Sequence, residues 1–429
     1  MANKPKSLTQ RATASLKGLS RTKEILPKDS EIARPTPSTP SIPEDIEIAT
    51  EREFPEAEKV NITKKLPRNV AILHIYENGE NQYSVWGGHV DKGLLQTDPE
   101  QKPLLSLGLQ VKNLVPPDII KDFMNEFSRL NVKLRNWIKG LRSQFGEHLC
   151  LVIADYTDFE IPWEMLELSP QQSSHEYIGA LITTVRWRKV ISVVDDDYLV
   201  LKFKADECCG KTVAYVLDTE LEGSKSELES LKKLQGTIYQ SSEDNNSIDK
   251  FHTHLQSDDA DHSFVYISCH GTFKNSPEEM ALGSASNEQQ QLKLQALRKR
   301  PLNLVQKSQG IVFINACHSA REQVHPIIRH SYRMGFIQLF LEQGARGVIG
   351  TLGAVGDIYA AEFACELIKE SSQSSPLPVA ELLKNLRLKA VKNLGDKPTE
   401  EQLLSLIYRF MYVYYGSPMT VLRLTLPGE

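Results

Sequence analysis

Two short stretches decide the fold: FVYISCHG at 264–271 and IVFINACHS at 311–319. Each begins with four apolar residues of high strand propensity and then changes abruptly to polar residues. Strands of a parallel sheet covered on both faces read as continuous apolar runs of this kind. Because binding and catalytic residues of open α/β sheets collect at the carboxyl ends of strands, we expect His270 and Cys317 to meet at one edge.

The residues around these two stretches alternate between strand-like and helix-like patterns. Beyond 205 the patterns predict strands at 213–217, 237–239, 347–351, 410–415 and 420–424, and helices at 226–234, 247–255, 336–343, 358–369 and 379–392. Strands that alternate with helices indicate an α/β fold with a mostly parallel sheet flanked by helices. We expect this core to cover residues 206–429.

Residues 66–205 predict an N-terminal α+β accessory layer. Asn78-Gly79 is a pair typical of tight hairpins and joins two short apolar runs. The elements expected in this layer are strands at 70–76, 82–86 and 149–154 and one long helix at 117–144.

Residues 1–65 differ from the rest in composition. Bases dominate 1–28, acids dominate 29–60, and Phe54 is the one aromatic residue of the segment. A segment of this kind buries too little apolar surface to offset the entropy of ordering, so we expect a disordered tail. A docking or cleavable pro-segment and a transit peptide remain open as alternatives.

The composition of the chain excludes several classes of protein. A net charge of −5 over 429 residues argues against direct nucleic-acid binding. The six cysteines show no disulfide-scaffold or CxxC spacing, which favours a reduced, cytoplasmic protein. No apolar run reaches the 18 or so residues of a membrane span, so we expect no membrane contact.

The residues at the two strand ends suit thiol chemistry without any cofactor. Cys317 would attack a carbonyl as the nucleophile, and His270 would act as general acid and base. Backbone N–H groups of Gly271 and Cys317 would form the oxyanion hole. A metal site built from Cys269, His270, Cys317 and His318 lacks the usual zinc spacings, so we expect no metal there.

A cysteine at the end of an apolar strand is more often a small buried hydrophobe than a nucleophile. Cys269 and Cys365 fit that reading. Cys317 differs because its neighbours are polar and because a second strand ends in His270 and Gly271. His318 adjoins the thiol, but neighbours on an extended segment point to opposite sides, so we expect it to be structural or to face the substrate.

Five motifs, in the correct order, resemble the CHAT proteases, which are bacterial caspase-like peptidases often joined to tetratricopeptide repeats. The motifs are IPWEML at 161–166, YISCHG at 266–271, FINAC at 313–317, GARGVIGTL at 344–352 followed by Asp357, and YYG at 414–416. Leu352-Gly353 stands where the family commonly has tryptophan, and no 34-residue helical repeat is visible. The 47 residues between His270 and Cys317 are close to the caspase spacing of about 50.

The resemblance implies a caspase-like fold over 66–429, a His270–Cys317 dyad and endopeptidase activity on a protein substrate. It also implies activation by a sensor or partner protein in bacterial defence or regulated cell death. In caspase-type enzymes the S1 pocket, which receives the P1 residue before the scissile bond, draws on positions matched here by Asp218 and Asn315. Asp357 belongs to the same sheet edge. An aspartate there would pair with a basic P1 side chain, or would only cap the following helix.

Three hypotheses follow from the sequence. The leading one is a cysteine endopeptidase, because intact His270, Gly271 and Cys317 serve no purpose in an inactive protein. The others are a catalytically silent caspase-like scaffold that recruits partners, and a thiol hydrolase of small amides. The polar segment 274–300 is predicted to be a mobile loop and an autolysis site, and 319–335 a second loop beside Cys317.

Overall fold

The computed structural model describes residues 66–103, 117–157, 159–170, 175–194, 196–273, 277–324, 333–395 and 397–426. The tail predicted at 1–65 lies outside these residues. All the described residues belong to one unit of the chain, Pro55–Glu429. None of the helices within these ranges has the length and apolar character needed to cross a bilayer.

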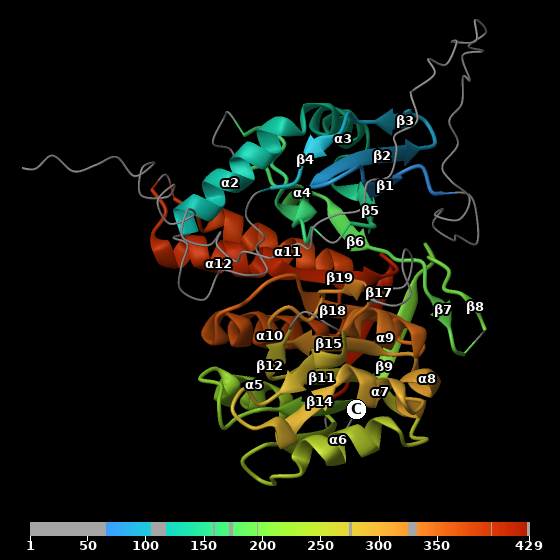
Figure 1. Cartoon of the computed structure of the whole chain (residues 1–429), viewed down its shortest axis with the longest axis vertical. Coiled ribbons are helices and arrows are strands. Elements are labelled where there is room, and N and C mark those ends of the chain that lie inside the picture. The colour runs from blue at the N-terminus through green and yellow to red at the C-terminus, as the bar shows by residue number, and fades with distance from the viewer. Residues whose placement is uncertain are drawn as a thin grey trace, which may run out of the picture. The chain divides into compact units, whose positions relative to one another are not determined.

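One mixed sheet runs through both parts of the chain (Figure 1). Its order is β10 (Gly236–Gln240), β9 (Asp206–Val216), β11 (His262–Ser268), β15 (Ile311–Asn315), β18 (Gly347–Thr351), β19 (Tyr412–Gly416), β6 (Thr183–Arg186), β5 (Cys150–Asp155), β1 (Val70–Glu77), β2 (Gln82–His89) and β3 (Gly93–Gln96). In addition, β20 (Thr420–Leu424) pairs with β9, and β4 (Glu100–Gln101) pairs with β2.

The strands from β10 to β18 are all parallel, and β19 is antiparallel to β18. The strands β6, β5 and β1 are parallel again, and β2 and β3 close the sheet as an antiparallel meander. The mostly parallel sheet predicted from the sequence is confirmed. A single parallel pair, Tyr415 beside Arg186, joins the two parts of the sheet.

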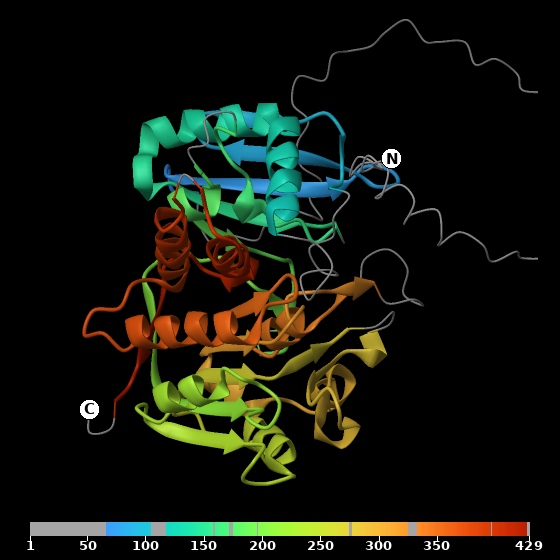
Figure 2. The ribbon, with the colours of Figure 1, turned by 90° about the vertical axis from the view of Figure 1, so that its left-hand side faces the viewer.

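Helices flank the sheet. They are α2 (Pro117–Leu130), α3 (Val132–Phe145), α4 (Ile178–Leu181), α5 (Ser224–Leu231), α6 (Ser247–Leu255), α7 (Leu294–Arg298), α8 (Asn303–Ser308), α9 (Phe336–Glu342), α10 (Asp357–Ser371), α11 (Val379–Lys392) and α12 (Glu400–Met411). Figure 1 shows α5 and α10 to the left of the strands and α8 and α9 to the right. Figure 2 shows the blue and teal elements of 70–155 at one end and the yellow-green α6 at the other.

The helix predicted at 117–144 is interrupted at Asn131, which separates α2 from α3. The backbone of Asn131 leaves the helical region, with φ −81° and ψ 47°. Its buried side chain donates hydrogen bonds to the Tyr83 hydroxyl at 2.8 Å and to the Phe127 carbonyl at 2.9 Å. An asparagine that bonds locally competes with the helical ladder, and here tertiary contacts decide the outcome.

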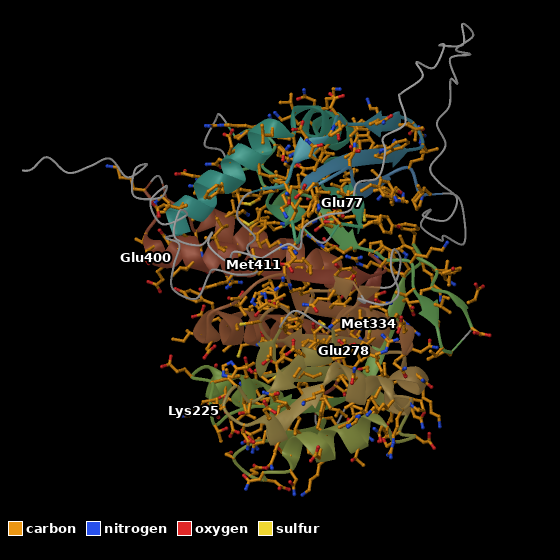
Figure 3. The ribbon with its side chains drawn as sticks, in the orientation of Figure 1. Glu77, Lys225, Glu278, Met334, Glu400 and Met411 are labelled. Carbon is orange, nitrogen blue, oxygen red and sulfur yellow. The ribbon has the colours of Figure 1, made fainter. Side chains whose placement is uncertain are left out.

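The strand predicted at 410–415 begins later, because residues 400–411 form helix α12. A capping box starts this helix: Thr399 Oγ1 accepts from the Gln402 amide at 3.2 Å, and Gln402 Oε1 accepts from the Thr399 amide at 2.8 Å. Met411, labelled in Figure 3, lies where α12 passes into β19, and its side chain is fully buried.

The polar segment predicted as a mobile loop forms ordered secondary structure in its described part. Strands β12 (His270–Thr272), β13 (Ala281–Gly283) and β14 (Gln291–Lys293) make a small antiparallel sheet, and α7 follows it. The apolar side chains Leu282, Leu292, Leu294 and Leu297 are buried. The apolar runs of this segment are short and are separated by polar, glutamine-rich turns, so the sequence predicted a loop. The chain instead forms a small sheet that begins at His270.

Candidate active site

The carboxyl ends of β11 and β15 bring His270 and Cys317 to the same edge of the sheet. The two strands are parallel neighbours with Ser268 paired to Asn315, so each candidate residue follows its paired position by two residues. Both residues line one pocket. A Cβ atom added to Gly271 would lie 2.0 Å from the Cys317 carbonyl oxygen, so only glycine permits this approach.

Three hydrogen bonds fix the turn that presents Cys317. The buried Ser319 hydroxyl donates to the Ile314 carbonyl at 3.0 Å and accepts from the Thr351 amide at 2.9 Å. The Thr351 hydroxyl donates to the Ala316 carbonyl at 2.6 Å. These bonds tie the turn to β18, so the thiol sits on a rigid support.

His318 does not continue an extended segment as predicted. Its φ of 58° places it in the left-handed region, which is uncommon for a residue other than glycine. Its amide donates to the Gly353 carbonyl at 3.0 Å, which holds the backbone in this conformation. Strained backbone of this type is frequent at functional sites.

The Cys317 thiol is partly exposed, unlike that of neighbouring Cys269. The amide of Val355 donates to Cys317 Sγ at 3.5 Å, and Sγ lies 3.6 Å from the Val355 carbonyl oxygen. The N–H that Val355 donates favours the thiolate form of Cys317, whereas the hydrogen bond that the thiol donates to the Val355 carbonyl favours the neutral form. By contrast, burial raises the pKa of the Cys269 thiol far above its usual value, so Cys269 stays neutral.

A carboxylate that the sequence analysis missed lies beside His270. The Glu220 Oε2 atom is 3.4 Å from His270 Nε2. Glu220 itself is held by the Ser284 and Ser286 hydroxyls and by the Ala285 amide at 2.9 Å. Burial alone would raise the pKa of Glu220, but these hydrogen bonds and the nearby imidazole hold that pKa below its usual value. Glu220 is therefore ionised at neutral pH and favours an imidazolium at His270.

Exchange of Glu220 for glutamine tests this positioning role. Without the carboxylate the imidazolium loses a stabilising neighbour, so its proton is released at lower pH. The alkaline limb of the pH–rate profile should shift to lower pH by about 0.5 to 1 unit. The shift is small because solvent screens this partly exposed pair of charges. Glu222→Gln, an exposed glutamate of the same loop, is the matched control and should leave the profile unchanged. An unaltered alkaline limb in Glu220→Gln would remove Glu220 from the mechanism.

Cys317 and His270 line a narrow pocket that two carboxylates, Glu227 and Asp357, also line. Its volume of about 20 Å³ holds roughly one water molecule. Buried Glu227 of α5 lines it, with Oε1 accepting from Asn315 Nδ2 at 2.8 Å and Oε2 making no hydrogen bond within the described residues. Burial raises the pKa of Glu227 to about 7.

Two of the three predicted S1 residues line this pocket. Asn315 is buried and also accepts from the Tyr412 hydroxyl at 2.6 Å, and Asp357 lies half-buried at the start of α10. Asp218 is not among the lining residues. Its carboxylate accepts from the Ser241 hydroxyl and the Ser242 amide, both at 2.9 Å, so Asp218 fixes the chain after β10 instead.

The sequence analysis placed Glu227 in the helix predicted at 226–234 but did not identify it as a site residue. The helix α5 begins at Ser224. Within it, Glu227 lies on the buried stripe formed by Ser224, Leu228 and Leu231. A carboxylate within an apolar helical stripe was the available signal, since unpaired carboxylates are rarely buried.

Residues 128–415 match the CHAT domain family. The chain belongs to this family. The match confirms the CHAT family that the five sequence motifs suggested. No curated protein matches the chain.

Solved structures similar to this CHAT protein include a separase complex and two gingipain structures. The separase–securin complex of Saccharomyces cerevisiae is 16% identical with a TM-score of 0.39, and the match covers 68% of this chain. The match covers only 17% of the separase chain. The complex of Porphyromonas gingivalis RgpB pro- and mature domains is 10% identical with a TM-score of 0.42 and 75% coverage of both chains. The Arg-specific cysteine proteinase gingipain R is 11% identical with a TM-score of 0.39, covering 72% of this chain and 76% of its own.

Proposed function

We propose that this CHAT protein is a cysteine endopeptidase with Cys317 as nucleophile and His270 as general acid and base. One observation carries the proposal: two paired parallel strands deliver both side chains to a single pocket. The close approach of Gly271 to the Cys317 carbonyl supports it, since only a residue without a Cβ lets the two strand ends come this near to each other.

The proposed reaction follows from the position of each group. The Cys317 thiolate attacks the scissile carbonyl carbon, and the resulting oxyanion accepts hydrogen bonds from the Gly271 and Cys317 amides. The His270 imidazolium gives its proton to the leaving amine as the C–N bond breaks. Water then attacks the thioester carbonyl carbon, and His270 takes the proton of that water. The C–S bond breaks, which releases the carboxylic acid product and restores the Cys317 thiolate beside the His270 imidazolium. The carboxylate of Glu220 orients the imidazole throughout.

We propose a basic residue at P1, on the strength of the acidic pocket. Glu227 and Asp357 both line it and offer two carboxylates to a cation, and Asn315 holds Glu227 in place. A cation entering this pocket would meet Glu227 Oε2, which makes no hydrogen bond within the described residues. A charge-assisted bond of this type contributes about 1.5 to 3 kcal/mol.

Glu227→Gln keeps the shape of the pocket and removes one charge. We expect kcat/KM for substrates with Arg or Lys at P1 to fall about 10- to 100-fold, with neutral P1 residues affected far less. In the wild type, KM for a basic P1 should fall as pH rises through about 7, because Glu227 then becomes charged. In Glu227→Gln that dependence should vanish. Glu229→Gln, an exposed position on α5, is the control. A preference for Arg and Lys that survives in Glu227→Gln refutes a basic P1.

The narrow pocket favours a protease that is latent until activated. A volume of about 20 Å³ does not admit a long side chain, so the loops that line the pocket must move before a substrate binds. A sensor or partner protein acting on the 66–205 layer or the 1–65 tail would supply that movement. We propose that this activation takes place in a bacterial defence or regulated cell-death pathway. The substrate would be a protein, and the protease would act in the cytoplasm.

The experiment that tests the proposal is cleavage of a broad peptide library by the wild type and by Cys317→Ala, with and without lysate of the native host. Cleavage that depends on Cys317 supports the endopeptidase and reports the P1 residue directly. Cleavage only in the presence of lysate supports partner activation. If the wild type cleaves nothing with or without lysate, and the Cys317 thiol does not react with iodoacetamide, the catalytically silent scaffold is favoured.

A further inference from the structure

A second cluster of chemically active side chains lies at the other end of β11, away from Cys317. It consists of His254 in the last turn of α6, Asp259 in the connection and His262 at the first position of β11. One ligand atom from each residue lies within 4.8 Å of the other two. The strand between His262 and Ser268 separates the cluster from the active-site edge by roughly 20 Å.

The buried member of the cluster is His262, which is 4% exposed. Its Nδ1 atom makes no hydrogen bond within the described residues and lies 3.4 Å from Asp259 Oδ2. A buried polar atom normally has a hydrogen-bond partner, so this nitrogen calls for an explanation. Nδ1 of His262 and Oδ2 of Asp259 are therefore placed to share one ion.

Neighbouring groups orient the other two members. The Tyr239 hydroxyl hydrogen-bonds to His254 Nδ1 at 2.9 Å, which assigns Nε2 of His254 to coordination. The rings of His254 and His262 are nearly perpendicular, with centroids 5.2 Å apart. Asp259 Oδ1 accepts from the Asp261 amide at 3.1 Å, which leaves Oδ2 for the centre. In metal sites, a hydrogen bond typically holds the nitrogen or oxygen of each ligand that does not bind the metal.

The cluster combines two imidazole rings with one carboxylate, and one lysine lies nearby. The nearby Lys211 is paired with the Asp261 carboxylate at 2.8 Å, which offsets its charge.

We propose that His254, Asp259 and His262 bind a divalent transition-metal ion of the Zn²⁺ class. Two imidazoles and one carboxylate suit Zn²⁺, and water would complete a tetrahedral set. Bonds of 2.0 to 2.2 Å require the three ligand atoms to close in by about 1 Å. The exposed Asp259 side chain permits this. The ion would join the end of α6 to the start of β11, which is a structural role at a distance from the thiol chemistry.

The test uses the full-length chain in the Cys317→Ala background, so that the active-site thiol binds no zinc. The protein is stripped with a chelator and titrated with Zn²⁺ in competition with a chromophoric chelator. We expect one equivalent of bound Zn²⁺. His254→Gln and Asp259→Asn should each weaken binding by at least about tenfold, and Tyr239→Phe by about tenfold. These residues are more exposed than His262, so their exchange threatens the fold less.

His252→Gln is the matched control, since His252 lies on the same helix and hydrogen-bonds to Gln256 rather than to the cluster. It should leave zinc affinity unchanged. The proposal is overturned if the wild-type background binds no zinc, if the ligand variants bind as tightly as their parent, or if His252→Gln weakens binding equally. Cobalt(II) spectra should report a tetrahedral site in the parent and not in His254→Gln. None of these readouts depends on peptidase activity.

Discussion

Cys317→Ala is expected to lower the rate of peptide cleavage by at least about 10⁴-fold, and His270→Ala by a similar factor. The reason is that nucleophile and base act as one unit: the imidazole has no thiol to activate without Cys317, and the thiol has no proton partner without His270. The double variant should therefore be no slower than either single variant. Purified protein in its activated form and a fluorogenic peptide chosen from the library provide the measurement.

Two controls separate chemistry from folding. Cys209→Ala removes an exposed thiol of β9 and should retain full activity. All variants should unfold at the same urea concentration as the wild type, because Cys317 is partly exposed and alanine leaves the turn held by Ser319 and Thr351. Residual activity in Cys317→Ala above one part in about 10² would assign the nucleophile to another residue.

The sequence predicted the parts of the fold that depend on local pattern. Buried parallel strands are continuous apolar runs, so β11, β15 and β18 were found from the sequence alone. The same runs locate His270 and Cys317, because strand ends fix the sheet edge. Predictions failed where a contact with a residue far away in the sequence sets the end of a helix. Asn131 ends α2 by donating a hydrogen bond to Tyr83, which lies 48 positions earlier in the chain.

The carboxylates of the candidate site show the same limit. Asp218, Glu220 and Glu227 all follow β9 within eleven positions, and each suits a cationic or imidazole partner on composition alone. Only the fold separates them: Asp218 contacts Ser241 and Ser242, Glu220 faces His270, and Glu227 lines the same pocket as the thiol. Sequence reasoning identifies that an acidic segment lies near the site, whereas side-chain direction and helix register assign the roles.

Glu164→Gln is expected to lower the free energy of unfolding by about 3 to 5 kcal/mol. Glu164 is buried and accepts two hydrogen bonds from Arg186, from Nε at 3.0 Å and from Nη2 at 2.7 Å. Burial alone would raise the pKa of Glu164, but Arg186 holds it below its usual value. Removing the carboxylate leaves the buried guanidinium of Arg186 without a counter-charge.

A second buried cation makes the loss more severe. Arg387 of α11 lies near Glu164, donates to the Tyr412 carbonyl at 2.6 Å, and has its pKa lowered by burial to about 10. Two guanidinium groups thus depend on one carboxylate where β6 meets β19. The motif at 161–166 is therefore explained by stability at this junction. Since a whole domain is stable by only about 5 to 15 kcal/mol, Glu164→Gln should bring it close to unfolding.

Urea denaturation measures the effect, with the midpoint falling and the slope unchanged. The control is Glu176→Gln, which removes a partly exposed ion pair to Arg142 at 3.6 Å and should cost no more than about 1 kcal/mol. Combining Glu164→Gln with Arg186→Met should recover part of the loss, because one of the two uncompensated charges is then gone and an apolar side chain fills its place. If Glu164→Gln lowers the midpoint no more than Glu176→Gln does, the junction is not held by this pair. A loss that Arg186→Met does not relieve would assign the cost to packing of the side chain instead of to charge.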